Sequence, residues 1–322
     1  MNVHAPALVE SRRVGESVSS FGRDVVDDLS RAPKRLSPKY FYDVTGSELF
    51  EQITALPEYY PTRTELGILT ERAGEIAQLV RPGAALIEFG SGSTVKARIL
   101  LAAAALAAYV PVDISAGFLN QEAARLKRDL PRLRILPVAA DFTTPFELPA
   151  AVTLRAHVGF FPGSTIGNFE PSEAAKFLRH AARLLGRGAV LIVGVDLVKD
   201  TAVLNAAYDD AAGVTAAFNL NLLRRINREL GADFDLDRFR HKAFFNAAES
   251  RIEMHVESLA AQKVRICDRT VSFARGETIH TESSYKYTVE SFRALAAEAG
   301  WSPAAVWTDA KGYFSVHALR LA

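Results

Sequence analysis

The stretch "IEFGSGST", residues 87–94, places an acidic residue and two glycines at a spacing that suits ligand binding. Glycines at the end of an apolar strand allow a tight turn and let the backbone approach a ligand closely. Gly90 and Gly92 occupy such positions, and Glu88 precedes the first of them by two residues. A dinucleotide fingerprint needs a third glycine three residues on, where this chain has Val95. The pattern therefore disfavours a nicotinamide dinucleotide.

Acidic residues also end the next two predicted strands. Asp113 lies about 20 residues after the glycines, where an acid can accept hydrogen bonds from ribose hydroxyls. Asp141 and Phe142 end the third strand and offer one polar and one apolar contact to an adenine ring. A single such acid is expected to be a helix cap or a loop residue. Three acids at consecutive strand ends predict a bound adenosyl group, and the position of Glu88 is typical of S-adenosylmethionine-dependent methyltransferases.

A second polar group lies in "GETIHTESSYKYTVESF", residues 276–292. Residues two apart on an extended segment point to the same side. Glu282 and Ser284 can therefore face one ligand while Ser283 faces away. The alternative is a solvated loop, which would be favoured for a lone glutamate.

The elements that position these residues follow from apolar segments alternating with helical ones. Five segments are predicted strands: 84–90, 108–115, 134–142, 156–169 and 189–197. Alternation of this kind indicates βαβ units and a parallel sheet, with ligands at the carboxyl ends of the strands. The predicted fold class is α/β with a Rossmann-like sheet.

The alternation stops after Lys199. Residues 204–231 are predicted as two helices and 241–266 as strands, and the chain closes with a helix and two strands. Residues 1 to about 20 are predicted to be a mobile leader, followed by short helices and loops rather than a sheet. We expect 61–199 and 286–322 to form the cofactor-binding domain, and 1–60 and 200–285 to form a substrate-binding domain.

Composition limits the classes of protein. The 322 residues are 49% hydrophobic and 23% charged, with a formal net charge of +1. This is ordinary globular composition without an electrostatic footprint for nucleic acid or an anionic membrane. The single cysteine, Cys267, excludes an internal disulfide and is expected to be a small core side chain. We find no signal peptide, and the longest apolar run, 99–112, is too short to span a bilayer. A cytoplasmic monomer is expected.

Four stretches are long enough to be specific for a family: "KYFYDVTGSELFEQITALPEYYPTRTE" (39–65), "FFPGSTIGNF" (160–169), "LNAAYDDAAGVTAAFN" (204–219) and "GETIHTESSYKYT" (276–288). They resemble the histidine-specific N-alpha methyltransferases of ergothioneine biosynthesis, over nearly the whole chain from about Pro38. The resemblance implies an S-adenosylmethionine-dependent enzyme that converts L-histidine to its trimethylammonium betaine, hercynine. It also implies a class I methyltransferase sheet with an additional substrate-binding domain.

The same resemblance implies roles residue by residue. The cofactor would be bound by Tyr42, Gly90, Lys96, Asp113, Asp141 and Phe142. The substrate would be bound by Tyr59, Gly163, Asn168, Tyr208, Phe218, Met254, Glu282 and Ser284. Asn168 and Tyr208 would hold the substrate carboxylate as neutral donors. Glu282 and Ser284 would bind the imidazole. Tyr59 and Thr165 lie near the amine as candidate catalytic residues.

Several of these residues also have purely structural interpretations. Tyr59 taken alone is expected to be a packing aromatic, and Phe218 and Met254 are expected in a hydrophobic core. Asn168 could cap the helix that begins near Pro171. Only their combination with the motifs favours a binding role.

Other functional classes fit less well. Val95 and the absence of an evident hydride-transfer partner disfavour a nicotinamide oxidoreductase, and intact cofactor motifs disfavour a non-catalytic binding subunit. Methylation of another amino acid or small amine is the alternative within the same fold. Five histidines show no metal-ligand spacing, so no metal site is expected among them: His157, His180, His241, His255 and His280.

Overall fold

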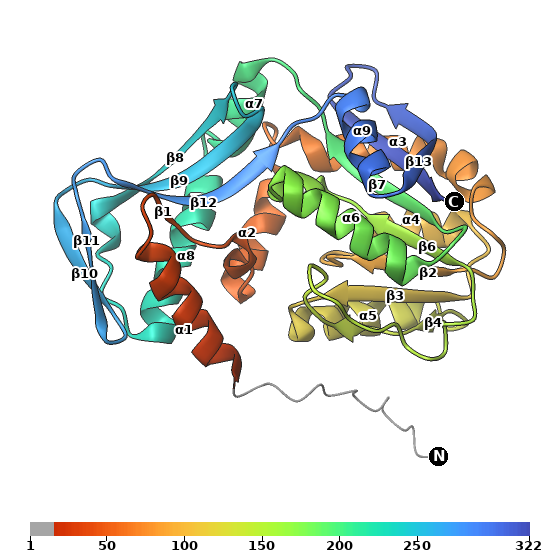
Figure 1. Ribbon diagram of the computed structural model, residues 1–322, viewed down its shortest axis with the longest axis horizontal. Helices are drawn as coiled ribbons and strands as arrows, with labels where there is room; N and C mark the ends of the chain where they lie inside the picture. Colours follow the sequence, from red (N-terminus) through yellow and green to blue (C-terminus); the bar gives the residue numbers. More distant parts are fainter. Residues whose placement is uncertain (1–15) are drawn as a thin grey trace.

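The computed structural model describes residues 16–322 and shows two β-sheets with helices around them (Figure 1). The larger sheet has eight strands in the order β13-β14-β7-β6-β2-β3-β4, with β5 beside β3. Its strands are β2 (Ala85–Phe89), β3 (Ala108–Asp113), β4 (Arg134–Ile135), β5 (Val138–Ala139), β6 (His157–Phe161), β7 (Val190–Asp196), β13 (Trp301–Thr308) and β14 (Phe314–Leu321). The predicted α/β, Rossmann-like fold class is confirmed.

The central strands of this sheet are parallel. β2 pairs in parallel with both β3 and β6, and β6 with β7, whereas β14 runs antiparallel to β7 and β13. Residues of β2 and β7 are buried throughout, as expected where helices cover both faces of a sheet. The chain runs outward from β2 through β3 and returns to β6 on the other side. Ligands bind at such a reversal, outside the carboxyl ends of the strands.

Helices cover both faces of the larger sheet. Apolar side chains of α3 and α4 pack on one face, and those of α6 and α9 on the other. The bounds are α3 (Tyr60–Gln78), α4 (Val95–Ala103), α5 (Ala116–Asp129), α6 (Pro171–Leu185) and α9 (Val289–Glu298), with a 3-10 turn η2 (Thr165–Asn168) after β6.

The smaller sheet has the order β1-β12-β9-β8 and encloses a separate apolar core with α1, α2, α7 and α8. Its strands are β1 (Lys34–Arg35), β8 (Phe239–Asn246), β9 (Arg251–Ser258) and β12 (Thr278–Tyr285), and β10 (Gln262–Ile266) and β11 (Arg269–Phe273) form a hairpin. The helices are α1 (Glu16–Leu29), η1 (Pro38–Phe41), α2 (Val44–Ala55), α7 (Thr201–Tyr208), α8 (Val214–Leu230) and η3 (Leu236–Arg238). This core joins N-terminal residues to residues 204–279.

Some expectations need correction. The N-terminal region contributes a strand as well as helices, because β1 pairs in parallel with β12. The predicted strand 156–169 ends at Phe161, and 134–142 forms two short strands. Most of the predicted leader lies outside the described residues, and α1 begins at Glu16. Cys267 is exposed in the β10–β11 turn at φ 54°, so the expectation of a core position is wrong.

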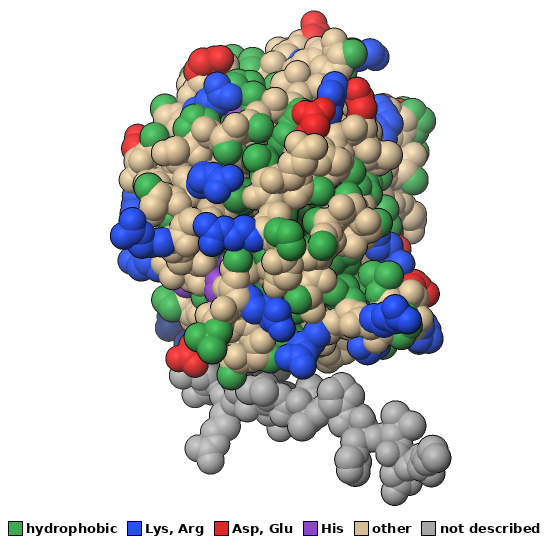
Figure 2. All heavy atoms as spheres, turned by 90° about the vertical axis from the view of Figure 1, so that its right-hand side faces the viewer, with side chains coloured by type: hydrophobic (Ala, Val, Ile, Leu, Met, Phe, Trp, Pro, Cys, Tyr) green, Lys and Arg blue, Asp and Glu red, His purple; other side chains and the backbone are tan. Residues whose placement is uncertain are grey.

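The surface carries charges of both signs. On the face that corresponds to the right-hand side of Figure 1, basic and acidic side chains are interspersed with uncharged ones (Figure 2). Within residues 16–322, no helix combines the length and the apolar character needed to cross a membrane.

Candidate functional site

The glycine turn after β2 is folded against Phe142. Gly90 has φ 72°, a conformation that side chains other than glycine rarely adopt, and a Cβ there would lie 3.3 Å from Phe142 Cε1. The Gly90 amide donates to Val112 O at 2.9 Å, which ties the turn to β3. The buried carboxyl of Glu88 accepts a hydrogen bond from Tyr109 OH. Burial raises the pKa of Glu88 to about 7.

The two aspartates stand at neighbouring strand ends, as predicted. Asp113 Oδ1 accepts from Ser115 N at 2.8 Å, and burial raises the pKa of its carboxyl. Asp141 Oδ1 accepts from Thr143 N at 2.9 Å. Both therefore hold their own loops in place. These hydrogen bonds fix the orientation of each carboxylate.

Lys96 and Gly163 share one buried carboxylate. Glu65, on α3, is fully buried and accepts from Lys96 Nζ at 2.5 Å and from Gly163 N at 2.9 and 3.0 Å. A Cβ on Gly194 of β7 would lie 1.9 Å from Glu65 Oε1, so glycine is required there to make room. Lys96, a candidate cofactor residue, and Gly163, a candidate substrate residue, thus share Glu65 as a hydrogen-bond partner.

Aromatic side chains cluster in the apolar core of the smaller sheet. Phe50 of α2 lies 5.8 Å from Tyr42, 6.2 Å from Tyr59 and 6.1 Å from Phe218, measured between ring centroids. Tyr59 also lies edge-on to Tyr208 at 6.2 Å. Burial raises the pKa of Tyr42, Tyr59 and Tyr208 well above 10, with the carboxylate of Glu282 adding to the effect, so these phenols stay neutral.

Strand β12 carries Glu282 and Ser284 on one side, as predicted. Ser284 Oγ lies 2.8 Å from Tyr208 OH, whereas Ser283 Oγ faces the other side and lies 3.2 Å from His280 Nε2. Glu282 is opposite Met254 in the β9–β12 register. Burial raises the pKa of Glu282 to about 7 despite the Lys286 ammonium, and among residues 21–322 no donor bonds to its carboxyl group. The solvated-loop interpretation is therefore wrong.

A buried ionic network stands behind Tyr208 and Ser284. Lys286 Nζ donates to Ser284 Oγ at 2.7 Å and to Tyr208 OH at 3.0 Å, and it lies 2.8 Å from Asp196 Oδ2. The ammonium of Lys199 lies 2.6 Å from the other Asp196 oxygen. Burial acts against the charge on Asp196, but the two lysines hold the pKa of its carboxyl below the usual range. A cation, Lys286, is thus in contact with Tyr208, one of the two neutral donors expected to hold the substrate carboxylate.

The turn η2 brings Asn168 and Thr165 to β12. A Cβ on Gly167, within this turn, would lie 2.7 Å from Tyr285 O, so the two backbones are in close contact. Thr165 Oγ1 donates to Pro162 O at 3.0 Å, which leaves its oxygen as an acceptor. The cap of α6 is Glu170, not Asn168, so the capping interpretation of Asn168 is wrong.

Sequence reasoning missed six residues that hold this region together: Phe50, Tyr60, Glu65, Asp196, Lys199 and Lys286. Asp196 ends a predicted strand, and the reasoning applied to Asp113 would have found it. Lys286 stands within the stretch that drew attention to Glu282 and was passed over. Glu65 gives no signal, since a lone glutamate on a helix is expected at the surface.

Comparison with known proteins decides the family. Residues 21–321 match the family described as "Histidine-specific methyltransferase, SAM-dependent". The chain belongs to this family. It is 48% identical over 301 residues to the histidine N-alpha-methyltransferase of Mycolicibacterium smegmatis, which covers 91% of this chain and 92% of that protein. The corresponding protein of Mycobacterium tuberculosis is 45% identical with the same coverage. Ergothioneine biosynthesis protein 1 of Neurospora crassa is 30% identical over 87% of this chain and 32% of that protein.

Membership in this methyltransferase family establishes S-adenosylmethionine as the methyl donor. The residues at the larger sheet fit that molecule. The glycine turn leaves open backbone beside an aromatic edge at Phe142, and Asp113 presents a fixed carboxylate one strand away, where the fold class places ribose hydroxyls. The sheet is accordingly that of a Rossmann-like class I methyltransferase.

Proposed function

We propose that this methyltransferase transfers three methyl groups from S-adenosylmethionine to the alpha-amino group of L-histidine, forming hercynine in the first step of ergothioneine biosynthesis. One observation carries the proposal: Glu282 and Ser284 lie buried on the same face of β12, and the glutamate carboxyl has no protein donor among the described residues. A buried carboxyl without a partner is costly. An imidazole N–H supplies the missing donor. The 48% identity to a histidine N-alpha-methyltransferase supports the same substrate.

The proposed cofactor residues are Tyr42, Gly90, Lys96, Asp113, Asp141 and Phe142. Their support is position: four of them stand at the carboxyl ends of β2, β3 and β5, where open sheets bind ligands. When bound, S-adenosylmethionine supplies a methyl group activated by its sulfonium. Tyr42 comes from the N-terminal region. Burial raises the pKa of its hydroxyl, and the charges of Glu282 and Asp113 add to this effect, which supports a position near both proposed binding regions.

The proposed substrate residues act by orientation. Asn168 and Tyr208 bind the carboxylate, and Lys286 behind Tyr208 adds a positive charge that attracts it. Glu282 and Ser284 hold the ring, with Met254 across from Glu282. With both ends of the amino acid fixed, its amine points to one place, and alignment of nitrogen with the methyl group is the main task of such an enzyme.

Tyr59 and Thr165 are the proposed catalytic residues. The amine must be neutral to attack, and a polar group or water must take its proton. The Thr165 hydroxyl has its proton engaged by Pro162 O, so its oxygen can accept a hydrogen bond from the amine. Gly163, whose amide donates to Glu65, is the third residue proposed to lie near the amine. As methyl groups accumulate, the nitrogen becomes a fixed cation, and the faces of Tyr59 and Phe218 stabilise it.

The proposal also covers the domain organisation and the cellular setting of the enzyme. Residues 1–60 and 200–285 form the substrate-binding domain, and 61–199 with 286–322 form the methyltransferase domain; the separate apolar cores support this division. The net charge of +1 and the single cysteine support a monomeric cytoplasmic enzyme without a nucleic-acid or membrane partner.

The test is mass spectrometry of L-histidine incubated with the enzyme and S-adenosylmethionine. We expect mono-, di- and trimethylated histidine, with the trimethylated product accumulating. Phenylalanine, which lacks ring nitrogens, should be a very poor substrate because Glu282 and Ser284 would be left unpaired. Faster methylation of another amino acid or small amine than of histidine would replace the proposed substrate with that compound.

A further inference from the structure

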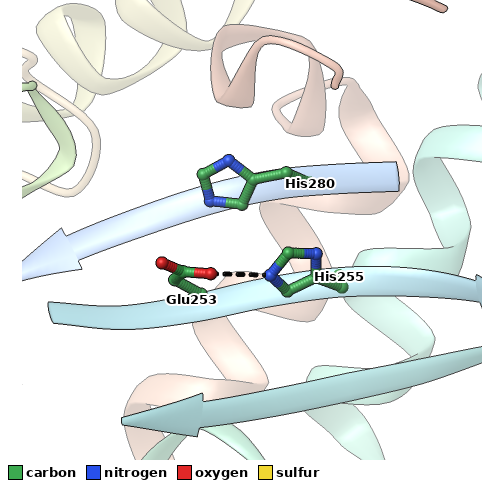
Figure 3. Close-up of side chains that lie close together, drawn as sticks. All are labelled: Glu253, His255 and His280. Atoms are coloured by element: carbon green, nitrogen blue, oxygen red, sulfur yellow. Dashed lines mark hydrogen bonds and ion pairs between the residues drawn. The ribbon is translucent and has the colours of Figure 1, made fainter. Parts of the chain in front are cut away.

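Two imidazoles and a carboxylate meet on the outer face of the smaller sheet. One donor atom each of Glu253, His255 and His280 lies within 4.8 Å of the others (Figure 3). Glu253 and His255 are two residues apart on β9 and so point to one side, and His280 of β12 is opposite His255 in the register. Met254, between the two β9 residues, points to the opposite face. The cluster therefore lies behind the proposed substrate site and is separate from it.

The atoms are spaced like ligands of a single ion. His255 Nε2 lies 3.0 Å from Glu253 Oε2. His280 Nε2 lies 3.0 Å from Glu282 O and 3.2 Å from Ser283 Oγ. Ligand atoms at the corners of a tetrahedron with bonds of about 2.0–2.1 Å lie about 3.3 Å apart. The rings of His255 and His280 would have to rotate out of their stacked arrangement to direct one nitrogen each toward the same ion.

Surrounding residues hold the ligands in place. Glu253 Oε1 accepts from Arg251 Nε at 2.9 Å and from Asn246 Nδ2 at 3.0 Å, which leaves Oε2 beside the imidazole of His255. The rings of His255 and His280 are stacked at 4.9 Å, and Phe244 covers the other face of His255 at 5.5 Å. Partners that fix the orientation of a ligand strengthen metal binding.

We propose that Glu253, His255 and His280 bind one divalent transition-metal ion, of the class to which Zn²⁺ belongs. Imidazole suits zinc, copper and nickel, whereas Mg²⁺ and Ca²⁺ prefer sites made only of oxygen. Ser283 Oγ, Glu282 O or water completes the coordination. Residue spacing predicted no metal site, because the ligands come from two strands that are paired in space but distant in the chain.

The proposed ion would cross-link β9 and β12 through its ligands, next to the bulge between His280 and Glu282. Since β12 carries Glu282 on its other face, occupancy stabilises the backbone that orients this residue. Only the effect of the ion on the orientation of Glu282 rests on the proposed function. Metal binding itself is measured without turnover, so a failure of one proposal is distinguishable from a failure of the other.

The test uses the full chain without an affinity tag, freed of metal by a chelator and dialysis. Zn²⁺ is titrated in competition with a chromophoric chelator, and L-histidine is left out because it binds metals. We expect one Zn²⁺ per chain and a higher melting temperature. His255→Asn and Glu253→Gln should each weaken binding at least about tenfold. The matched control His180→Asn, on α6, should bind like the wild type.

Circular dichroism of the metal-free variants checks their folding. If Glu253→Gln unfolds, the loss of metal affinity is measured with His255→Asn, whose side chain lies on the outer face of the sheet. Co²⁺ as a second probe should give visible absorption that disappears in His255→Asn. Two results would overturn the proposal: wild-type affinity no greater than that of a His255→Asn/His280→Asn variant, or one-to-one binding that survives in that variant.

Discussion

The ammonium of Lys286 lies 2.8 Å from the carboxylate of Asp196, and both side chains are almost completely buried. Lys286 follows the end of β12 and Asp196 ends β7, so this pair joins the smaller sheet to the larger one. Because the same ammonium donates to Tyr208 OH and Ser284 Oγ, the pair also determines where these hydroxyls point.

Lys286→Met should lower the free energy of unfolding and, as a second effect, weaken the binding of histidine. Removing one partner of a buried ion pair costs about 3 kcal/mol or more, and Asp196 keeps only Lys199 as a cation. Urea unfolding measures this loss. The Michaelis constant for histidine should also rise, at unchanged affinity for S-adenosylhomocysteine. In Asp196→Asn/Lys286→Met the stability should recover in part while the Michaelis constant stays high. Recovery of both would mean that Lys286 is only structural.

Asp113→Ala should weaken cofactor binding. The variant removes acceptors for ribose hydroxyls at the end of β3, a loss of order 1–3 kcal/mol in binding free energy. Calorimetry with S-adenosylhomocysteine measures it. Asp129→Ala, at the exposed end of α5, is the matched control and should bind normally. An unchanged affinity in folded Asp113→Ala would remove this residue from the cofactor site.

The carboxylate clamp can be tested from both sides. Asn168→Ala and Tyr208→Phe should each raise the Michaelis constant for histidine and leave S-adenosylhomocysteine binding nearly intact. Tyr208→Phe also removes an acceptor from Lys286, so the larger effect is expected there. Histamine lacks the carboxylate and should be a poor substrate of the wild type. If histamine is methylated as well as histidine, the clamp does not exist.

Glu282→Gln should stabilise the ligand-free protein at high pH. Burial raises the pKa of Glu282 from 4.5 to about 7, so between these values the folded state binds more protons than the unfolded state. Stability contributed by this group is therefore complete below pH 4.5 and is lost as the pH rises to about 7. At pH 8 the variant should be more stable by roughly 3 kcal/mol. Melting temperatures at pH 5 and pH 8 measure the difference, and an equal gain at both values would contradict it.

Glu282→Ala with Ser284→Ala should remove most of the preference for histidine over phenylalanine. Both side chains face the same region from β12, and a site that hydrogen-bonds a ring nitrogen rejects analogues that lack it. Competition assays with the two amino acids measure the ratio. Ser283→Ala, whose hydroxyl faces His280 on the other side, is the matched control. Wild-type selectivity in the folded double variant would exclude these residues from recognition.

Strand patterns and motifs predicted the larger sheet well, because short apolar runs that end in Gly90, Asp113 and Asp196 are typical of buried parallel strands. They also predicted that Glu282 and Ser284 share a side, since this follows from the two-residue period of a strand. Contacts between distant segments were not predictable. Nothing in the local sequence around Glu65 indicates that Gly194 leaves room for its carboxylate, or that His280 meets His255 across two strands.

The parallel pairing of β1 with β12 aligns Lys34 with Ile279. During synthesis, the N-terminal strand therefore has no partner until the ribosome has added more than two hundred further residues. All five strands from β2 to β6, and β7 after them, emerge in that interval. We infer that β1 stays unpaired on the nascent chain while the larger sheet begins to form. Long-range pairing of this kind is slow. The core around the smaller sheet can therefore close only after β12 has been synthesised, and its N-terminal residues are exposed to aggregation until then.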